Sequence, residues 1–325
     1  MLNKKLLVSS LISMFVATSL FGAKVTAIKT AIAEESFQLQ IVTEVLKKMG
    51  HTVEFTNDVD YTIAFQTIAD NAKNNDVYFM AAHWDPVQSN MIKGVGGKDK
   101  LAIFSPYIEN CASGYVIDKK TADKYNIKYI SDLADPKIAK LFDSSGNGKA
   151  DLTGASVGWE VAKTIDYHLD AFKLRDTVDH NQGTYSALLA DTMARYKTGK
   201  SVVFFTWTPY WLSGTLVPGK DIVFLQVSKN SHPKGINTEL SNGDNYGFPI
   251  NSQKIVANKS VLTQHKDIAK LFDIIKLDVN DVSGQNMLMK NGQKTPNDIK
   301  RHVQKWLVAN ERKVNAWIKE AKETK

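Results

Sequence analysis

The sequence predicts an α/β protein built from two lobes. Stretches with strand character alternate with stretches of helical spacing, an order that is typical of mostly parallel sheets flanked by helices. The chain has 325 residues, and about 300 remain once the expected signal segment is removed, which is enough for two domains of about 150 residues. Strand character returns after residue 246. The chain is therefore expected to cross between the lobes more than once.

The N-terminal segment, residues 1–23, has the three-part pattern of a secretory signal peptide. Lys4 and Lys5 precede an apolar stretch over residues 6–21, and two small residues follow. That stretch is short for a membrane span, although retention as an uncleaved anchor is an alternative. Cleavage is expected after Ala23, with Ala27 as the alternative position, so the mature chain is expected to be secreted.

Charge and cysteine content exclude some classes of protein. The chain has 41 Lys and Arg against 34 Asp and Glu, a formal charge of +7, and loss of the two signal lysines lowers this charge to +5. The lysines form no basic run and no pattern of arginine with aromatic residues, so nucleic-acid binding is not expected. Cys111 is the sole cysteine. No intrachain disulfide can form, and stability must come from the core.

The first part of the chain shows a regular alternation of elements. Helical spacing after Ser36, a candidate N-cap, ends at Gly50, a candidate C-terminal stop. The expected elements are a strand at 25–30, a helix at 37–49, a strand at 52–55, a helix at 63–74 and a buried strand at 77–82. The last strand places Trp84 at its carboxyl end, where open α/β sheets bind ligands.

The second part repeats this alternation. The expected elements are a strand at 114–117, helices at 121–125 and 136–142, a helix after Trp159, a helix at 185–197, strands at 201–206 and 255–257, and a last helix over 299–318. Trp306 and Trp317 lie on one face of that last helix and are expected in the core. The segment 143–151 resembles the start of a calcium loop, but it lacks the distal acid and contains Lys149, which favours a tight turn.

Three tryptophans stand beside turn-forming residues at expected strand ends or at a helix start: Trp84, Trp159 and Trp207. Several indole faces together attract a bulky cation that cannot donate hydrogen bonds, so the three favour a quaternary ammonium ligand. Any one of these tryptophans taken alone is better explained as an ordinary core or loop aromatic, so the prediction depends on the three together.

The helix expected after Trp159 offers a site for an anion. The free backbone N–H groups of Glu160 and Val161 would point out of its first turn, where the helix dipole favours a carboxylate. A ligand with a carboxylate and a quaternary nitrogen would satisfy both features. The alternative is that Glu160 is an ordinary first-turn acid.

Sequence motifs for catalysis and for metal or cofactor binding are missing. The seven histidines show no metal-ligand spacing, and there is no nucleophile elbow, phosphate loop or dinucleotide fingerprint. We therefore expect no metal, no cofactor and no enzymatic activity. A secreted enzyme that acts on quaternary amines stays the alternative of another class.

Several segments closely resemble the periplasmic glycine betaine/proline betaine-binding proteins of osmoprotectant ABC transporters (the ProX family), over nearly the whole mature chain. These segments are Glu34-Glu35-Ser36-Phe37, Trp84-Asp85-Pro86, residues 135–143, His180-Asn181-Gln182-Gly183, residues 206–211 and Asn245-Tyr246-Gly247-Phe248-Pro249. The resemblance implies a two-lobed periplasmic binding protein fold with the ligand in the cleft. Lobe I is expected over residues 24–110 and 245–325, and lobe II over 111–244.

The same resemblance implies a site. The ligand's trimethylammonium group would lie in a box of Trp84, Trp159 and Trp207, and its carboxylate would accept the N–H groups of Glu160 and Val161. Gln88 stands where a relative has a carboxylate-binding histidine, and a glutamine amide still donates but carries no charge.

Two further positions, Ala155 and Val161, stand where a relative has a disulfide beside the central tryptophan. The loop before Trp159 must then be held by packing and hydrogen bonds.

The resemblance also implies a function. The chain would be the substrate-binding component of an ABC importer that captures glycine betaine and proline betaine, with a membrane permease and an ATPase as partners and a monomer as the simplest state. Choline, carnitine and a sulfonium analogue are the alternative ligands on the same scaffold.

Overall fold

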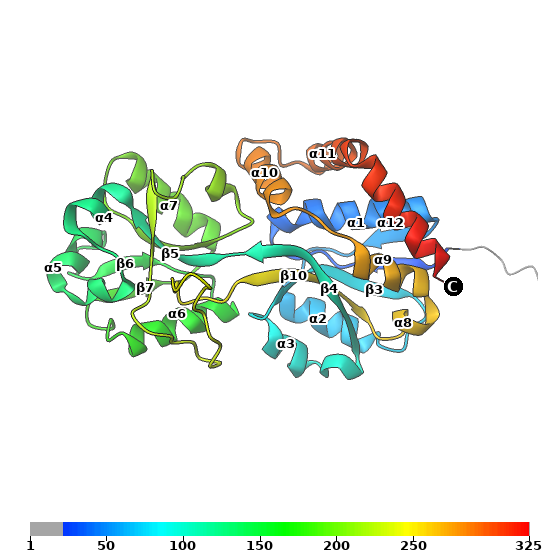
Figure 1. Ribbon diagram of the computed structural model, residues 1–325, viewed down its shortest axis with the longest axis horizontal. Helices are drawn as coiled ribbons and strands as arrows, with labels where there is room; N and C mark the ends of the chain where they lie inside the picture. The colour runs from blue at the N-terminus through cyan, green and yellow to red at the C-terminus, as the bar shows by residue number, and fades with distance from the viewer. Residues whose placement is uncertain (1–21, 325) are drawn as a thin grey trace, which may run out of the picture.

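The computed structural model describes residues 22–324, which form two lobes lying side by side (Figure 1). Each lobe is built on a five-stranded sheet with helices packed against it. Apart from residues 22 and 23, the expected signal segment lies outside the described residues. No helix between residues 22 and 324 is both long enough and apolar enough to cross a membrane.

The sheet of the first lobe joins strands from both ends of the chain. In order across the sheet, these strands are β2 (Thr52–Phe55), β1 (Lys24–Ala27), β3 (Val77–Asp85), β10 (Asn251–Asn258) and β4 (Leu101–Cys111). Val25 pairs in parallel with Val53 on one side and with Val77 on the other. β10 pairs antiparallel with both of its neighbours, so one strand runs against the other four.

Helices cover both faces of this sheet. They are α1 (Ser36–Met49), α2 (Tyr61–Asp70), α3 (Ser89–Gly94), α8 (Val261–Gln264), α9 (Lys266–Ile274), α10 (Val279–Lys290), α11 (Pro296–Ala309) and α12 (Glu311–Glu323). Successive residues of β3 point to opposite faces: Phe79 packs in the core beneath α1 and α9, and Met80 packs with Phe65 of α2. Burying one such side chain contributes about 1.5–3 kcal/mol.

The sheet of the second lobe has the same pattern of directions. Its strands, in order, are β7 (Val178–Asn181), β6 (Ala150–Thr153), β8 (Val203–Trp207), β5 (Ser113–Asp118) and β9 (Ile222–Leu225). β5 is the strand that runs antiparallel to its neighbours. The helices of this lobe are α4 (Lys119–Tyr125), α5 (Pro136–Ala139), α6 (Glu160–Ala171) and α7 (Tyr185–Lys197), with short 3-10 turns that include η5 (Trp211–Gly214).

The chain crosses between the lobes twice, and each crossing is next to the reversed strand of a sheet. The first crossing joins β4 to β5, and the second leads into β10 (Figure 1). The second crossing comes later than residue 245, because Phe248 still packs against Tyr115 and Phe205 of the second lobe. The two-lobed α/β architecture expected from the sequence is present.

Several element boundaries differ from the expectation. α1 starts at Ser36 but is preceded by a 3-10 turn, η1 (Ala33–Glu35), and the Ser36 hydroxyl donates to Ala33 O instead of capping the helix. Gly50 ends α1 in the left-handed conformation, with φ of 105°, as expected. The helix expected at 63–74 lies at Tyr61–Asp70.

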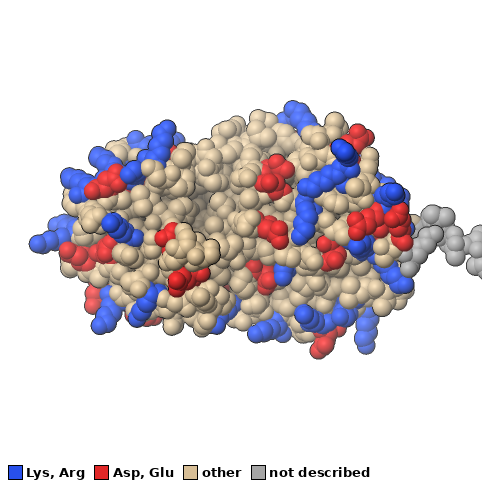
Figure 2. Space-filling model, in the orientation of Figure 1, with Lys and Arg blue, Asp and Glu red and all other residues tan. Residues whose placement is uncertain are grey.

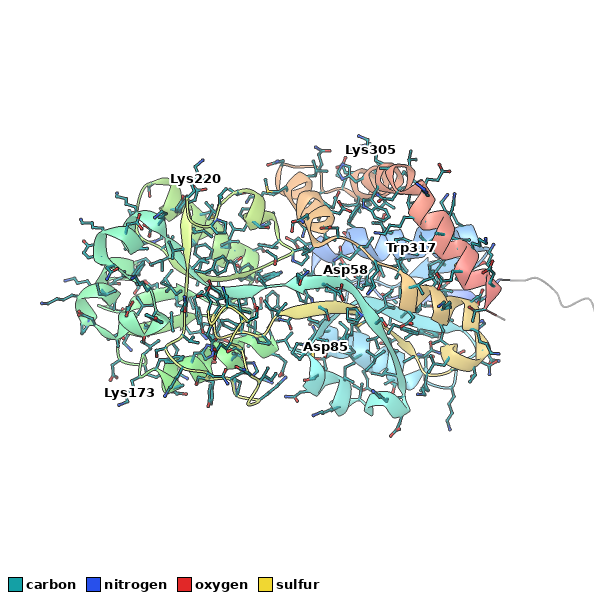
Figure 3. The ribbon with its side chains drawn as sticks, in the orientation of Figure 1. Asp58, Asp85, Lys173, Lys220, Lys305 and Trp317 are labelled. Carbon is teal, nitrogen blue, oxygen red and sulfur yellow. The ribbon has the colours of Figure 1, made fainter. Side chains whose placement is uncertain are left out.

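The expected single last helix is wrong, because the chain bends at Asn310 to give α11 and α12. The backbone N–H and the side chain of Asn310 both donate to Trp306 O at 2.9 Å, so this residue caps the end of α11. Trp306 and Trp317 are nonetheless buried in the core of the first lobe, with ring centroids 6.4 Å apart. Trp317 lies on α12, on the side of the first lobe away from the second (Figure 3).

The acidic segment 143–151 folds as a turn held by its own hydrogen bonds. Asp143 accepts the backbone N–H groups of Gly146 and Gly148, and Asp151 accepts those of Ser144 and Ser145. These bonds lower the pKa of Asp143. The described residues contain no group of three or more His, Cys, Asp or Glu placed to hold a metal ion.

Candidate functional site

A cavity of about 100 Å³ lies between the two lobes and is lined by both of them. The first lobe contributes Trp84 and Gln88, and the second contributes Trp159 and Trp207. On the face drawn in Figure 2, lysine and arginine side chains are scattered over both lobes among acidic ones, with few charges near the middle. The cavity itself is lined mostly by uncharged residues, with Glu34, Glu35 and Glu160 as its acidic side chains.

The second lobe brings a cluster of aromatic rings to the cavity. Trp207 is the last residue of β8, and Trp159 is the residue just before α6. Their ring centroids lie 5.6 Å apart with the planes at 76°. Tyr185 stacks against Trp159 at 6.0 Å, and Tyr210 lies 4.6 Å from Trp207. Trp159, Trp207 and Tyr210 line the cavity, so indole and phenol faces form its wall in this lobe.

The buried tyrosine Tyr185 supports this wall from behind. Its hydroxyl donates to Phe205 O at 2.7 Å, which ties α7 to β8. Burial raises the pKa of Tyr185 well above its usual range, so the hydroxyl stays neutral and the ring stays in place. Neither tyrosine was among the residues expected at the site: Tyr185 is the first residue of α7, and Tyr210 follows Pro209 just beyond the end of β8.

Trp84 faces the cavity from the first lobe, and a buried glutamate holds its indole. Trp84 Nε1 donates to Glu35 Oε1 at 2.9 Å. Tyr61 OH donates to the same carboxylate at 2.6 Å, and the Thr30 hydroxyl donates to its other oxygen. Burial raises the pKa of Glu35 to about 7, against the opposing effect of these three donors. The orientation of the Trp84 ring is therefore fixed from behind by one carboxyl group.

Gln88 lies one turn beyond Trp84 and is buried. Its side-chain oxygen accepts the Trp84 backbone N–H at 2.9 Å, and its own backbone N–H donates to Trp84 O at 2.8 Å. The side-chain oxygen of Gln88 therefore already accepts a hydrogen bond from the protein backbone. The amide N–H groups are what Gln88 can offer to a ligand.

The N-terminus of α6 meets the cavity at Glu160 and Val161. The first hydrogen bond of this helix turn runs from Ala162 N–H to Trp159 O at 3.0 Å. The two preceding N–H groups therefore have no partner inside the helix and lie at the positive end of its dipole. A carboxylate is the kind of group that such an end binds.

The Glu160 carboxylate is directed toward cations and an amide. It lies 2.6 Å from Lys163 Nζ and 3.5 Å from Lys234 Nζ, and Asn90 of α3 donates to it at 3.5 Å. Burial acts to raise the pKa of Glu160, but the two lysines outweigh it and the pKa is lowered. Its negative charge is thus compensated beside the helix end.

These contacts also join the two lobes at the rim of the cavity. Lys234, in the loop after β9, donates to Val87 O at 2.9 Å and lies 3.4 Å from the Ser89 hydroxyl, both in the first lobe. On another side, Lys290 of α10 lies 4.1 Å over the Trp211 ring of η5. The described conformation is therefore one in which the lobes are in contact around the cavity.

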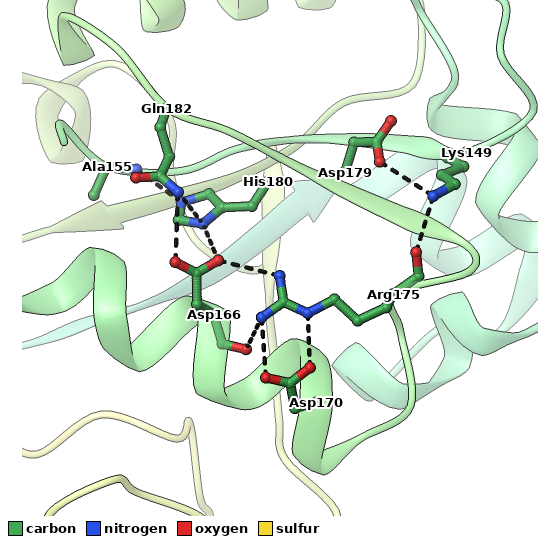
Figure 4. Close-up of polar contacts among 8 residues, drawn as sticks. All are labelled: Lys149, Ala155, Asp166, Asp170, Arg175, Asp179, His180 and Gln182. Carbon is green, nitrogen blue, oxygen red and sulfur yellow. Dashed lines mark hydrogen bonds and ion pairs between the residues drawn. The ribbon is translucent and has the colours of Figure 1, made fainter.

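The loop that carries Trp159 is fixed by a polar network instead of a disulfide (Figure 4). His180 Nε2 accepts the Ala155 backbone N–H at 3.4 Å, and His180 Nδ1 lies 3.1 Å from Asp166 of α6. Arg175 in turn contacts Asp166 at 3.4 Å and Asp170 at 2.7 Å. The bond from Ala155 requires an unprotonated Nε2, so the neutral ring carries its proton on the nitrogen that faces Asp166.

Gly154 permits this arrangement. A Cβ atom at this position would stand 1.9 Å from His180 Nε2. Any larger residue would displace the imidazole and with it the acceptor for the loop. The expectation that packing and hydrogen bonds hold the loop in place of a disulfide thus has a concrete structural basis in His180.

One lining residue outside the expected set is His232, in the irregular loop between β9 and β10. This loop has no periodic pattern, and a lone histidine in it gives no signal in the sequence. The expected residues Trp84, Trp159, Trp207, Gln88, Glu160 and Val161 all line the same cavity. The structure thus brings together all six and adds His232 to them.

Comparisons with known proteins agree on one family. Residues 23–309 match the family described as the substrate binding domain of ABC-type glycine betaine transport systems. The chain is 46% identical over 314 residues to the glycine betaine-binding periplasmic protein OusX of Dickeya dadantii, covering 95% of this chain and 93% of the relative. It is 44% identical over 302 residues to the glycine betaine/proline betaine-binding periplasmic protein of Escherichia coli, covering 92% and 90%.

A solved structure supports the fold. Lactococcal OpuAC, crystallised in a closed form with glycine betaine, has a TM-score of 0.68 to this chain at 18% sequence identity, with 91% of this chain and 99% of that chain covered. The two-lobed binding-protein fold expected from the sequence is confirmed. The chain belongs to the family of substrate-binding domains of ABC-type glycine betaine transport systems.

Proposed function

We propose that this chain captures glycine betaine or proline betaine in the periplasm and delivers the ligand to the permease and ATPase subunits of an ABC importer. The observation that carries the proposal is the convergence of Trp84, Trp159 and Trp207, from two lobes, on one cavity that ends at the start of α6. Residues 1–23 act as the signal that directs the chain there, the mature protein acts as a monomer, and it has no catalytic role.

The three indoles bind the trimethylammonium group. Each well-placed ring face contributes about 0.5–2 kcal/mol, with the higher value for a desolvated cation. A quaternary nitrogen has no N–H groups, so it leaves no donor unpaired against the rings. Tyr210 adds a further ring beside Trp207, which closes the wall of the second lobe.

The carboxylate of the betaine binds at the N-terminus of α6. The N–H groups of Glu160 and Val161 donate to it, and the amide of Gln88 donates from the first lobe. Because the cation site draws on both lobes and the carboxylate site does too, one ligand stabilises the closed arrangement. The lobes then close by a hinge at the two crossings. The first lobe is proposed over residues 24–110 and 245–325, and the second over residues 111–244. Residues 245–248 are the exception, since Phe248 packs against Phe205 and would move with the second lobe.

Isothermal titration calorimetry of the ligand-free protein with glycine betaine, proline betaine, choline and carnitine tests this proposal. We expect both betaines to bind more tightly than choline, which has no carboxylate for the helix end. Choline binding clearly tighter than either betaine would overturn the assignment. Proton NMR of glycine betaine after prolonged incubation with the protein tests the enzyme alternative, and an unchanged ligand spectrum is the expected result.

A further inference from the structure

His232 is a buried histidine that faces the cavity from the loop between β9 and β10. Its exposure is 7%, and it lines the same space as Gln88, Glu160 and Val161. The residue before it is anchored to α6, because Ser231 O lies 2.6 Å from Nε2 of the buried His168. The loop is thus tied to the helix whose first turn forms the proposed carboxylate site.

The hydrogen bonds of His232 determine which ring nitrogen can act on a ligand. The Lys234 backbone N–H donates to His232 Nδ1 at 3.2 Å. A backbone N–H can only donate, so Nδ1 holds a lone pair and the neutral ring carries its proton on Nε2. Burial, and then the charge of Lys234, lower the pKa of His232, which keeps the ring in this neutral form near pH 7.

The proton on Nε2 is left without an acceptor in the protein. Among residues 22–324, the His232 side chain has a hydrogen-bond partner at Nδ1 and none at Nε2. The residue is 7% exposed, and Nε2 is not one of the fully enclosed polar atoms, so this nitrogen is open to the cavity that His232 lines. The cavity beside it is where a ligand atom could accept this proton.

The other side-chain donor at this end of the cavity is the amide of Gln88, whose oxygen is held by the Trp84 backbone N–H. His232 is held in a similar way, by the Lys234 N–H and by the turn in which Gly235 N–H donates to His232 O at 2.9 Å. A donor that is already oriented loses little conformational freedom when a ligand binds.

We propose that His232 Nε2–H donates a hydrogen bond to the carboxylate of the bound ligand and is a specificity-determining residue of this protein. The inference rests on the proposed function, because it assigns a donor within the betaine site. His232 would complete the carboxylate site from the second lobe, because it lines the same cavity as Glu160 and Val161 of α6. It therefore separates quaternary ammonium ligands with a carboxylate from those without one.

The test compares His232→Leu with wild type by calorimetry, using glycine betaine and choline. Leucine keeps the apolar bulk and removes the donor. We expect the affinity for glycine betaine to fall by about tenfold or more, as for loss of a hydrogen bond to a charged group, and the affinity for choline to change by less than about twofold. His232→Gln, which keeps an N–H donor, should recover part of the lost affinity.

A matched control is His265→Leu, since His265 lies in the first lobe and bonds to Asn75 O at 2.6 Å, away from the cavity. It should leave both affinities unchanged. If wild type fails to bind glycine betaine, the proposed function itself fails. If wild type binds it and His232→Leu binds it equally well, or loses choline to the same extent, the proposed function stands and the role of His232 is refuted.

Histidine-ring NMR gives a readout that does not depend on choline. In wild type, glycine betaine should shift the signal of one Nε2-bound proton strongly downfield, and this signal should be missing from His232→Leu. Unchanged histidine signals on saturation with glycine betaine would overturn the proposal, even if choline binds too weakly to be titrated.

Discussion

Replacing Glu35 with glutamine should change how the stability of this protein depends on pH. Glu35 is buried, and burial raises its pKa from 4.5 to about 7. Between these values the folded protein holds a proton that the unfolded chain has released, so the free energy of unfolding falls as the pH rises toward and through 7. Each unit of pKa difference is worth about 1.36 kcal/mol, so the total loss is about 3 kcal/mol.

Glu35→Gln keeps the shape of the side chain and an oxygen that can accept from Trp84 Nε1 and Tyr61 OH, but it cannot ionise. Near pH 4.5 the variant and the wild type should have similar stability. At pH 8 the variant should have gained about 3 kcal/mol relative to wild type, because the wild type then carries a buried charge. Glu34, also buried enough to have a raised pKa, is the nearest other acid and is present in both proteins.

Urea denaturation at pH 4.5, 6.5 and 8, followed by circular dichroism, measures this difference. Glu239→Gln is the matched control, since the Glu239 side chain is exposed, and it should follow the wild-type curve at every pH. Parallel curves for Glu35→Gln and wild type would refute the reasoning. They would mean that folding does not raise the pKa of Glu35.

Further substitutions test the cavity and its supports. Trp159→Ala should weaken betaine binding by at least about tenfold, as loss of a desolvated cation-π contact of about 2 kcal/mol implies. Near-normal affinity by calorimetry would show that Trp159 does not belong to the box of three tryptophans. Gln88→His should strengthen binding of carboxylate ligands selectively, and an equal gain for choline would show that residue 88 is not a carboxylate contact. His180→Ala removes the acceptor of the Ala155 N–H, so amide exchange over residues 155–159 should speed up and affinity should fall; unchanged exchange would contradict that role. Lys234→Met removes the contacts across the rim of the cavity, so glycine betaine should dissociate faster in stopped-flow measurements, and an unaltered off-rate would argue against a role in closure.

Much of the fold could be predicted because its signals are local. Helical spacing located α1, and Gly50 marked its end, since glycine adopts the left-handed conformation at little cost. The same spacing failed at Asn310, which caps α11 and divides a continuous apolar face between α11 and α12. Apolar periodicity records which residues face the core, but it does not record where a helix bends.

The sequence alone was enough to predict a signal segment, and it located most of the alternating strands and helices and the three tryptophans at element ends. The signal for each of these features lies in residues that are close together in the sequence. The carboxyl ends of the parallel strands in a sheet lie at one edge, where ligands bind. Trp84 and Trp207 end strands of two different sheets, so it was the family resemblance that predicted one site for them and Trp159.

The contacts that surround these rings could be found only in the folded structure. Glu35 stands 49 positions before Trp84 and yet holds its indole. His232 lines the same cavity as the start of α6, although it lies in a loop without any periodic pattern. The tautomer of His232 and the contacts of Glu160 depend on which loops meet at the cleft. Which loops come together at the cleft depends on how the two lobes pack. The spacing of residues along the chain does not predict these contacts.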